Sequence, residues 1–257
     1  MSAAIPQTVI RSQEQSAALR TLASERLFYV IAGSVMLVAT AVGFRLFLAH
    51  GRGFGGGEIT HQILPLVVVH GLAMFGWIVL FLVQSILIAK GNPRLHMRIG
   101  VGGAVLAGVM VALGSVSAIL SARYNPDLYQ FFGGARFLLA IMLGEMISFG
   151  ALVGVAILHR RRPEIHRPMM LLASLMIISG SLGRCPYIGE FALRPPLYAL
   201  GPALVLGALF LVLQLGMTRA LNRWYAFGYS AMVVAACIFI VIGHSALWNQ
   251  IAGGMLR

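Results

Sequence analysis

The sequence predicts an all-α, polytopic membrane helical bundle of about seven transmembrane helices, with the N-terminus in the cytoplasm. Two observations predict this fold class. The 257 residues are 59% hydrophobic and only 10% charged, with a mean hydropathy of +0.89, a composition that excludes a soluble globular domain. Seven stretches also hold apolar runs of about 20 residues, the length that crosses the hydrocarbon core as a helix.

The elements are expected in a simple order along the chain. Residues 1–26 alternate apolar and charged side chains, which is typical of an interfacial amphipathic helix. Residues 27–257 then form one transmembrane domain, because no other stretch is long and polar enough to bury a soluble core. The predicted spans are 27–49, 63–89, 99–121, 137–158, 169–182, 197–217 and 226–246. The fifth is the shortest, and Gly180 and Gly183 are expected to end it early or unwind its last turn.

The basic residues predict orientation rather than a nucleic-acid partner. The net charge is +12, but most arginines lie in short loops between apolar stretches, where they meet anionic lipid headgroups. With the N-terminus inside, 12 of the 19 lysines and arginines fall on the cytoplasmic side and 7 on the other. This bias favours an N-terminus in the cytoplasm. Cys185 and Cys237 are expected at different depths and not as a disulfide.

Glu145 gives the sharpest functional signal. An ionisable group inside a span is costly and usually faces the protein interior or a wet cavity. We therefore expect Glu145 either to exchange a proton or coordinate a cation, which makes it the candidate catalytic residue, or to form a structural ion pair with Arg45 or Arg184. Depth along the predicted spans places the candidate residues in the outer half of the bundle: Arg45, His61, His70, Arg136, Glu145, Arg184 and His244.

His70 begins a helical stripe that continues with Met74, Trp77, Phe81 and Gln84. Such a stripe is typical of packing, but a histidine among aromatic side chains is also how a helix presents an axial ligand to haem. His70 and His244 are the predicted metal ligands, and His61 is an alternative. The cofactor is predicted to be haem b or a quinone, and the absence of any cofactor is left open. The residues predicted to bind it are His70, His244, His61, Trp77, Arg45, Arg136 and Arg184.

A second polar group lies at the predicted cytoplasmic helix ends. Histidine and arginine there usually contact headgroups or cap carbonyls, so we predict contact with anionic lipid or another anion. The residues are His96, Arg98, Arg161, Arg162, His166 and Arg167. The spacing of Pro93 to His96 recurs from Pro163 to His166, which a duplicated helical hairpin would explain.

Small residues recur every four positions in the third predicted span, which would form a smooth face for close packing on a neighbouring helix. They are Gly100, Ala104, Gly108 and Ala112. The glycine-rich stretch 51–57 lacks a phosphate-binding lysine and reads as an outer loop. A retinal protein is excluded because the only lysine, Lys90, lies in a loop and not inside the last span.

Two runs of the sequence carry a family resemblance. The run VVVHGLAMFGWIVLFLVQSILIAKGNPRLHMRIG, followed by RRPEIHRPMMLLAS, resembles bacterial multi-pass membrane proteins of unassigned function over residues 65–185. The shared features are a His-Gly helix with a tryptophan, then Leu-His-x-Arg-x-Gly, then His-Arg-x-Met. The resemblance implies a multi-helix membrane fold in the inner membrane of a bacterium. A more distant similarity to cytochrome b-like bundles rests on His70 alone, since those proteins place paired histidines deep on the same helices and this chain does not.

Three functions follow from these residues. The first is a redox-associated protein that binds haem b or a quinone near the outer face, with His70 as ligand or hydrogen-bond donor and Glu145 as proton relay. The second is a proton-coupled transporter, in which Glu145 titrates and the short fifth span is a broken helix. The third is a non-catalytic accessory subunit that binds the other subunits of a larger membrane complex.

Overall fold

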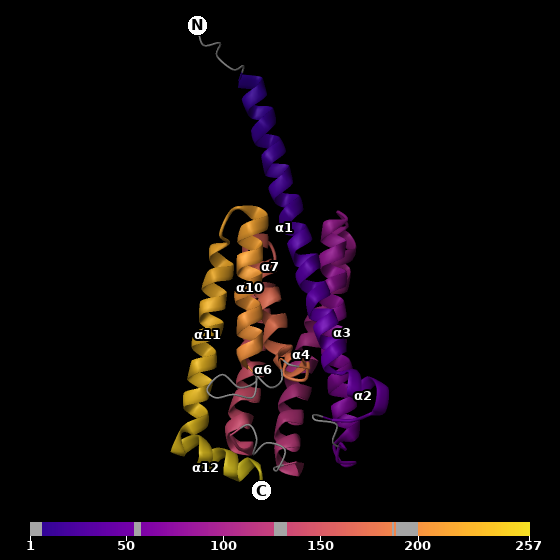
Figure 1. The fold of residues 1–257 in the computed structure, drawn as a ribbon, viewed down its shortest axis with the longest axis vertical. Coiled ribbons are helices and arrows are strands. Elements are labelled where there is room, and N and C mark those ends of the chain that lie inside the picture. Colours follow the sequence, from indigo (N-terminus) through magenta and orange to yellow (C-terminus); the bar gives the residue numbers. More distant parts are fainter. Residues whose placement is uncertain (1–6, 54–57, 126–132, 187, 189–199) are drawn as a thin grey trace.

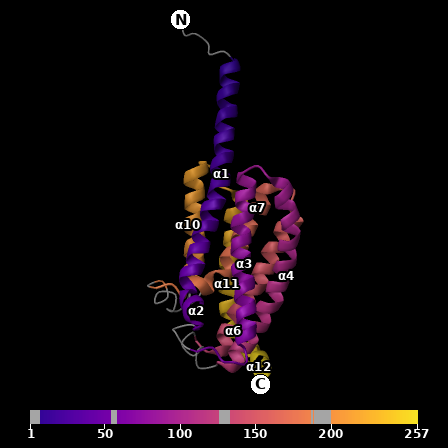
Figure 2. The same cartoon turned by 90° about the vertical axis from the view of Figure 1, so that its right-hand side faces the viewer.

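The chain folds into an all-α bundle in a computed structural model (Figures 1 and 2). The structure describes residues 7–53, 58–125, 133–186, 188 and 200–257. The helices are α1 (Gln7–Gly43), α2 (Arg45–His50), α3 (Leu64–Ala89), α4 (Pro93–Tyr124), α6 (Ala135–Leu158), α7 (Pro163–Ile177), α8 (Ser179–Leu182), α10 (Leu200–Thr218), α11 (Arg223–His244) and α12 (Ala246–Met255).

Within the described residues, six helices are long and apolar enough to span a membrane, so the chain is a multi-pass helical membrane protein. These six spans lie in α1 from Leu19, and in α3, α4, α6, α10 and α11. They match six of the seven predicted spans. The count of seven is not shown, because the fifth predicted span, 169–182, falls in two shorter helices, α7 with 15 residues and α8 with four. The two helices are separated at Ile178.

Helix α7 lies inside the bundle. All side chains from Leu171 to Leu175 are fully buried, and α7 packs on α6, α11, α10 and α3. A helix enclosed by protein does not need the length of a lipid-facing span, and a break in its backbone is tolerated where other helices cover it. This explains why an apolar run that looks like a span is shorter than one.

The N-terminal segment continues the first span. Helix α1 runs without a break from Gln7, and its first turns extend beyond the bundle (Figure 1). Residues 7–32 contain neither glycine nor proline, so nothing in the sequence interrupts the helix at residue 26. The placement of this segment at the membrane interface stays a prediction.

Helix α4 packs through a different face from the one predicted. Ala104, Gly108 and Ala112 are exposed, and no atom lies within 4 Å of the position of a Cβ on Gly108. The buried face instead includes Gly103 and Gly114. The sequence holds two stripes of small residues that are offset by one position, one with Gly103 and one with Ala104. The predicted stripe, with Ala104, is not the one that packs inside the bundle.

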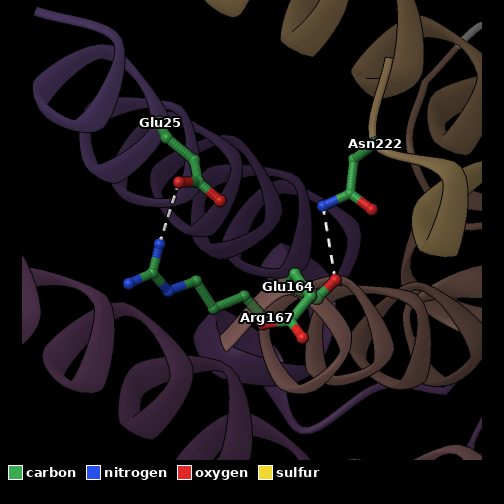
Figure 3. A network of polar contacts seen from close by, with 4 residues as sticks. All are labelled: Glu25, Glu164, Arg167 and Asn222. Carbon is green, nitrogen blue, oxygen red and sulfur yellow. Dashed lines mark hydrogen bonds and ion pairs between the residues drawn. The ribbon is translucent and has the colours of Figure 1, made fainter. Parts of the chain in front are cut away.

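One end of the bundle, here called the arginine-rich end, holds the turns that follow α3, α6 and α10 (Figure 1). Its basic residues include Lys90, Arg160, Arg161, Arg162 and Arg219. Figure 3 shows two of the contacts that join the helices there. Arg167 on α7 forms an ion pair with Glu25 on α1 at 3.0 Å, and the Asn222 amide donates to the backbone carbonyl of Glu164 at 3.4 Å. The opposite end, where α12 lies, is called the pocket end.

Candidate functional site

Glu145 lies where α6 meets three other helices. A Cβ at the preceding residue, Gly144, would strike the ring of Phe239 on α11, and the following residue, Met146, packs on Gly114 of α4. Because successive helical residues are 100° apart, Glu145 points to a third neighbour. That neighbour is Ser179 on α8, whose hydroxyl donates a hydrogen bond to the Glu145 carboxylate.

Ser179 is the first residue after the break at Ile178. Its hydroxyl also lies 3.2 Å from the backbone carbonyl of Met176 in the last turn of α7. The short α8 is held against α1 at Gly43, where a Cβ would come within 2.2 Å of the carbonyl oxygen of Ser181. The break therefore places a hydroxyl beside the carboxylate and depends on a glycine in α1.

The predicted ion pair between Glu145 and Arg45 or Arg184 is not formed. Arg45 donates to the carbonyl oxygens of Val42 (3.1 Å) and Arg184 (3.3 Å). The Arg184 side chain donates to the carbonyl of Gly180 at 2.7 Å, and its guanidinium lies 5.1 Å from the centre of the Phe44 ring. Among the described residues, Glu145 makes its hydrogen bond to Ser179 and no salt bridge.

His70 lies on α3 near this group. Its ring is against α4, since a Cβ on Gly114 would lie 3.4 Å from Cε1 of His70. Its Nδ1 is buried and makes no hydrogen bond within the described part of the chain. Met146, the residue after Glu145, packs at the same position on Gly114. We call five residues the α8 site: Ser179 on α8, together with His70, Glu145, Arg45 and Arg184.

Trp77 is part of the core. Its side chain is 2% exposed, its indole N–H donates to the hydroxyl of Ser174 at 3.0 Å, and its ring packs edge-on against Phe149 at 5.0 Å. The sequence analysis allowed Trp77 either to pack in the core or to bind a cofactor. These contacts show that it packs in the core.

His244 and Arg136 lie elsewhere, at the pocket end. The His244 ring packs on Phe137 at a centroid distance of 4.5 Å, and both His244 and Arg136 line an open pocket of about 570 Å³. His61 is exposed in the turn before α3. The outer-half residues therefore form two groups, the α8 site and the pocket, with His61 in neither.

The geometry does not fit one haem held by His70 and His244. Helix α3 packs on α1, α4 and α7, whereas α11 packs on α6, α7, α10 and α12. The two helices lie on opposite sides of the bundle (Figures 1 and 2). Within the described ranges, no group of three or more His, Cys, Asp or Glu side chains could hold a metal ion. A haem or quinone beside His70 alone stays a prediction.

The residues predicted to bind lipid or anions gather at the arginine-rich end. His96 and His166 lie with their rings perpendicular at 6.2 Å, so the two recurring motifs meet in space. His166 donates from Nδ1 to the carbonyl of Ala156 at 2.9 Å. Arg98, Arg161 and Arg162 are exposed, while Arg167 makes the ion pair with Glu25. Their contact with anionic lipid stays a prediction.

Ser179, Arg123 and Asn249 were missed by the sequence analysis. Serine is common and carries no charge, and the predicted end of the helix was based on Gly180 and Gly183 rather than on Ser179. Arg123 and Asn249 line the pocket beside Arg136 and His244. Both are polar residues that could bind a ligand, but a single sequence does not show that α4 and α12 bring them close to Arg136 and His244.

Comparisons with protein-family models, with curated proteins and with solved structures find no match to this chain. No family is identified, and the functional argument depends on the site itself.

Proposed function

We propose that this protein is a proton-coupled transporter of a small molecule, in which the Glu145 carboxylate takes up and releases the proton. One observation carries the proposal. Glu145 lies inside the bundle at the break between α7 and α8, with a serine hydroxyl as its partner and no cation paired with it among the described residues.

The physical argument starts from the cost of an ionised carboxylate away from water. That cost is several kcal/mol, roughly 2.5 to 3.5 on insertion scales, unless a cation or several hydrogen bonds offset it. A structural carboxylate would be expected to pair with arginine, and two arginines of the α8 site donate to backbone carbonyls instead. Since no cation neutralises Glu145 within the described part of the chain, an exchangeable proton is the way we propose.

The broken helix supports transport. Transporter sites are often built where a helix is discontinuous inside the bundle, because the break frees polar backbone groups and lets one half of the helix move. Here the break lies at Ile178, next to the hydroxyl that contacts Glu145. The arginine bias supports placement in a bacterial cytoplasmic membrane with the arginine-rich end inside.

The test is proton movement in liposomes that contain the purified protein and the pH-sensitive dye pyranine. After a pH gradient is imposed, wild-type protein is expected to dissipate it faster than protein-free liposomes do. Glu145→Gln should fall to the protein-free rate. The matched control is Glu164→Gln, which removes an exposed carboxylate at the start of α7 and should keep the wild-type rate. Equal rates for wild type and Glu145→Gln would contradict the proposal.

A redox role is the second candidate, and the buried Nδ1 of His70 favours it. A ring nitrogen without a hydrogen-bond partner in the described structure could bind haem iron or accept a hydrogen bond when it is unprotonated. When it is protonated, it could donate a hydrogen bond to a quinone carbonyl. A Soret band or extractable quinone in the purified protein that disappears in His70→Ala would favour this role over transport.

A further inference from the structure

The pocket end of the bundle carries a second site, distinct from the α8 site. Its pocket has a volume of about 570 Å³, within the range of small-molecule sites. It opens between the end of α4, the start of α6, the end of α11 and α12. The polar side chains that line it are Arg123, Arg136, His244 and Asn249.

The charge of this lining is positive. Arg123 and Arg136 contribute two guanidinium groups, and no acidic side chain is among the described residues that line the pocket. Helix α6 begins at its wall after Gly134, whose φ of 101° is a conformation that favours glycine. The first turn of α6 contains no acidic residue, so the positive end of the helix dipole adds to the two arginines.

The shape of the pocket is held by packing. Phe137 and His244 pack ring on ring at 4.5 Å and form an aromatic wall. The indole of Trp248 donates to the backbone carbonyl of Arg136 at 2.7 Å, which fixes α12 across the start of α6. A Cβ on Gly253 of α12 would lie 3.3 Å from the Arg136 guanidinium, so this side chain lies against α12.

We propose that this pocket binds a small organic anion, with a carboxylate or phosphate group on Arg123 and Arg136 and an apolar or aromatic part against Phe137 and His244. Guanidinium groups bind both kinds of anion through charge-assisted hydrogen bonds. The role of this anion as the transported substrate rests on the proposed function. Its binding does not, and is measured separately.

The binding test uses the full chain in uncharged detergent and titration calorimetry with two soluble probes, benzoate and inorganic phosphate. Because the same chemistry is present in lipid headgroups, a second arm measures phosphatidylglycerol binding in phosphatidylcholine nanodiscs. Saturable binding of a soluble probe or of phosphatidylglycerol is expected. Arg136→Gln should weaken it about tenfold, the effect of losing one charged hydrogen bond.

Two further variants make the result specific. Arg123→Gln changes an exposed side chain at the end of α4, so it should fold normally and weaken binding several-fold. Arg94→Gln removes the same charge from an exposed position at the other end of α4 and should leave binding unchanged. Binding that is absent in both arms, or equal in Arg136→Gln, Arg123→Gln and Arg94→Gln, overturns the proposal.

The two proposals fail separately. If Glu145→Gln binds the probe like wild type, the pocket is an anion site whatever the result of the proton-flux measurement. If proton movement depends on Glu145 but no probe binding depends on Arg136 or Arg123, the anion site is wrong and the proposed transport function stands.

Discussion

Two carboxylates of this protein, Glu25 and Glu145, have partners of different charge. Glu25, at the arginine-rich end, pairs with Arg167 at 3.0 Å, and the two side chains are 20% and 23% exposed (Figure 3). Glu145, inside the bundle, has a serine hydroxyl where Glu25 has a guanidinium. Both residues are partly buried, so the difference lies in the partner: Glu25 has an arginine, whereas Glu145 has a serine and, among the described residues, no cation.

The energies of the two regions differ accordingly. A partly exposed ion pair contributes about 0.2 to 1 kcal/mol, because water screens it. An ionised carboxylate in apolar surroundings costs several times as much, roughly 2.5 to 3.5 kcal/mol. The contact between Glu25 and Arg167 therefore joins two helices with little effect on stability, whereas the protonation of Glu145 is expected to affect stability and, in the proposed function, transport.

The largest stability effect is expected from the support of the α8 site. Gly43→Ala would place a Cβ against the Ser181 carbonyl, which must move. We expect a loss of about 1 to 3 kcal/mol in the free energy of unfolding, measured by thermal unfolding in detergent. Gly108→Ala is the matched control, since nothing lies within 4 Å of its Cβ position, and should leave stability unchanged or slightly higher.

A smaller effect is expected from Ser179→Ala, which removes the partner of Glu145. The loss of one hydrogen bond should cost about 1 kcal/mol of stability and change the rate of proton movement several-fold. Ser85→Ala removes a serine that bonds to the Phe81 carbonyl in its own helix, far from Glu145 in sequence, and serves as control. If both variants give the wild-type rate of pyranine response, Ser179 does not act on the proton.

The smallest effect is expected at the arginine-rich end. Arg167→Gln should lower stability by less than about 1 kcal/mol, and added salt should reduce the difference further. Proton movement should be unchanged. A loss of proton movement in Arg167→Gln, with α8 intact, would remove the functional distinction between the two regions.

The sequence predicted the spans better than their contacts. Run length identified six spans because each lipid-facing helix needs about 20 apolar residues. It does not distinguish α7 from a span, since a fully buried helix is as apolar as a span and the break at Ile178 lies within the apolar run. The four-residue spacing in α4 predicted packing at Gly108, which is exposed. Spacing shows which residues share a helix face, but not which face packs on a neighbouring helix.

The site was predicted in part for the same reason. Glu145 stood out because a carboxylate in a span is rare, and its predicted partners were arginines because charge was the only criterion available. In the structure those arginines donate hydrogen bonds to backbone carbonyls, and Glu145 accepts a hydrogen bond from a serine. His70 and His244 were placed together by depth, but depth along a helix does not say which helices are neighbours.

Infrared difference spectroscopy between high and low pH tests directly whether Glu145 exchanges a proton, because a protonated carboxylic acid has a C=O band that a carboxylate lacks. A carboxyl band that changes with pH is expected in wild type and in Glu164→Gln and should be missing in Glu145→Gln. Identical difference spectra for wild type and Glu145→Gln would show that Glu145 exchanges no proton, and the proposed function would be wrong.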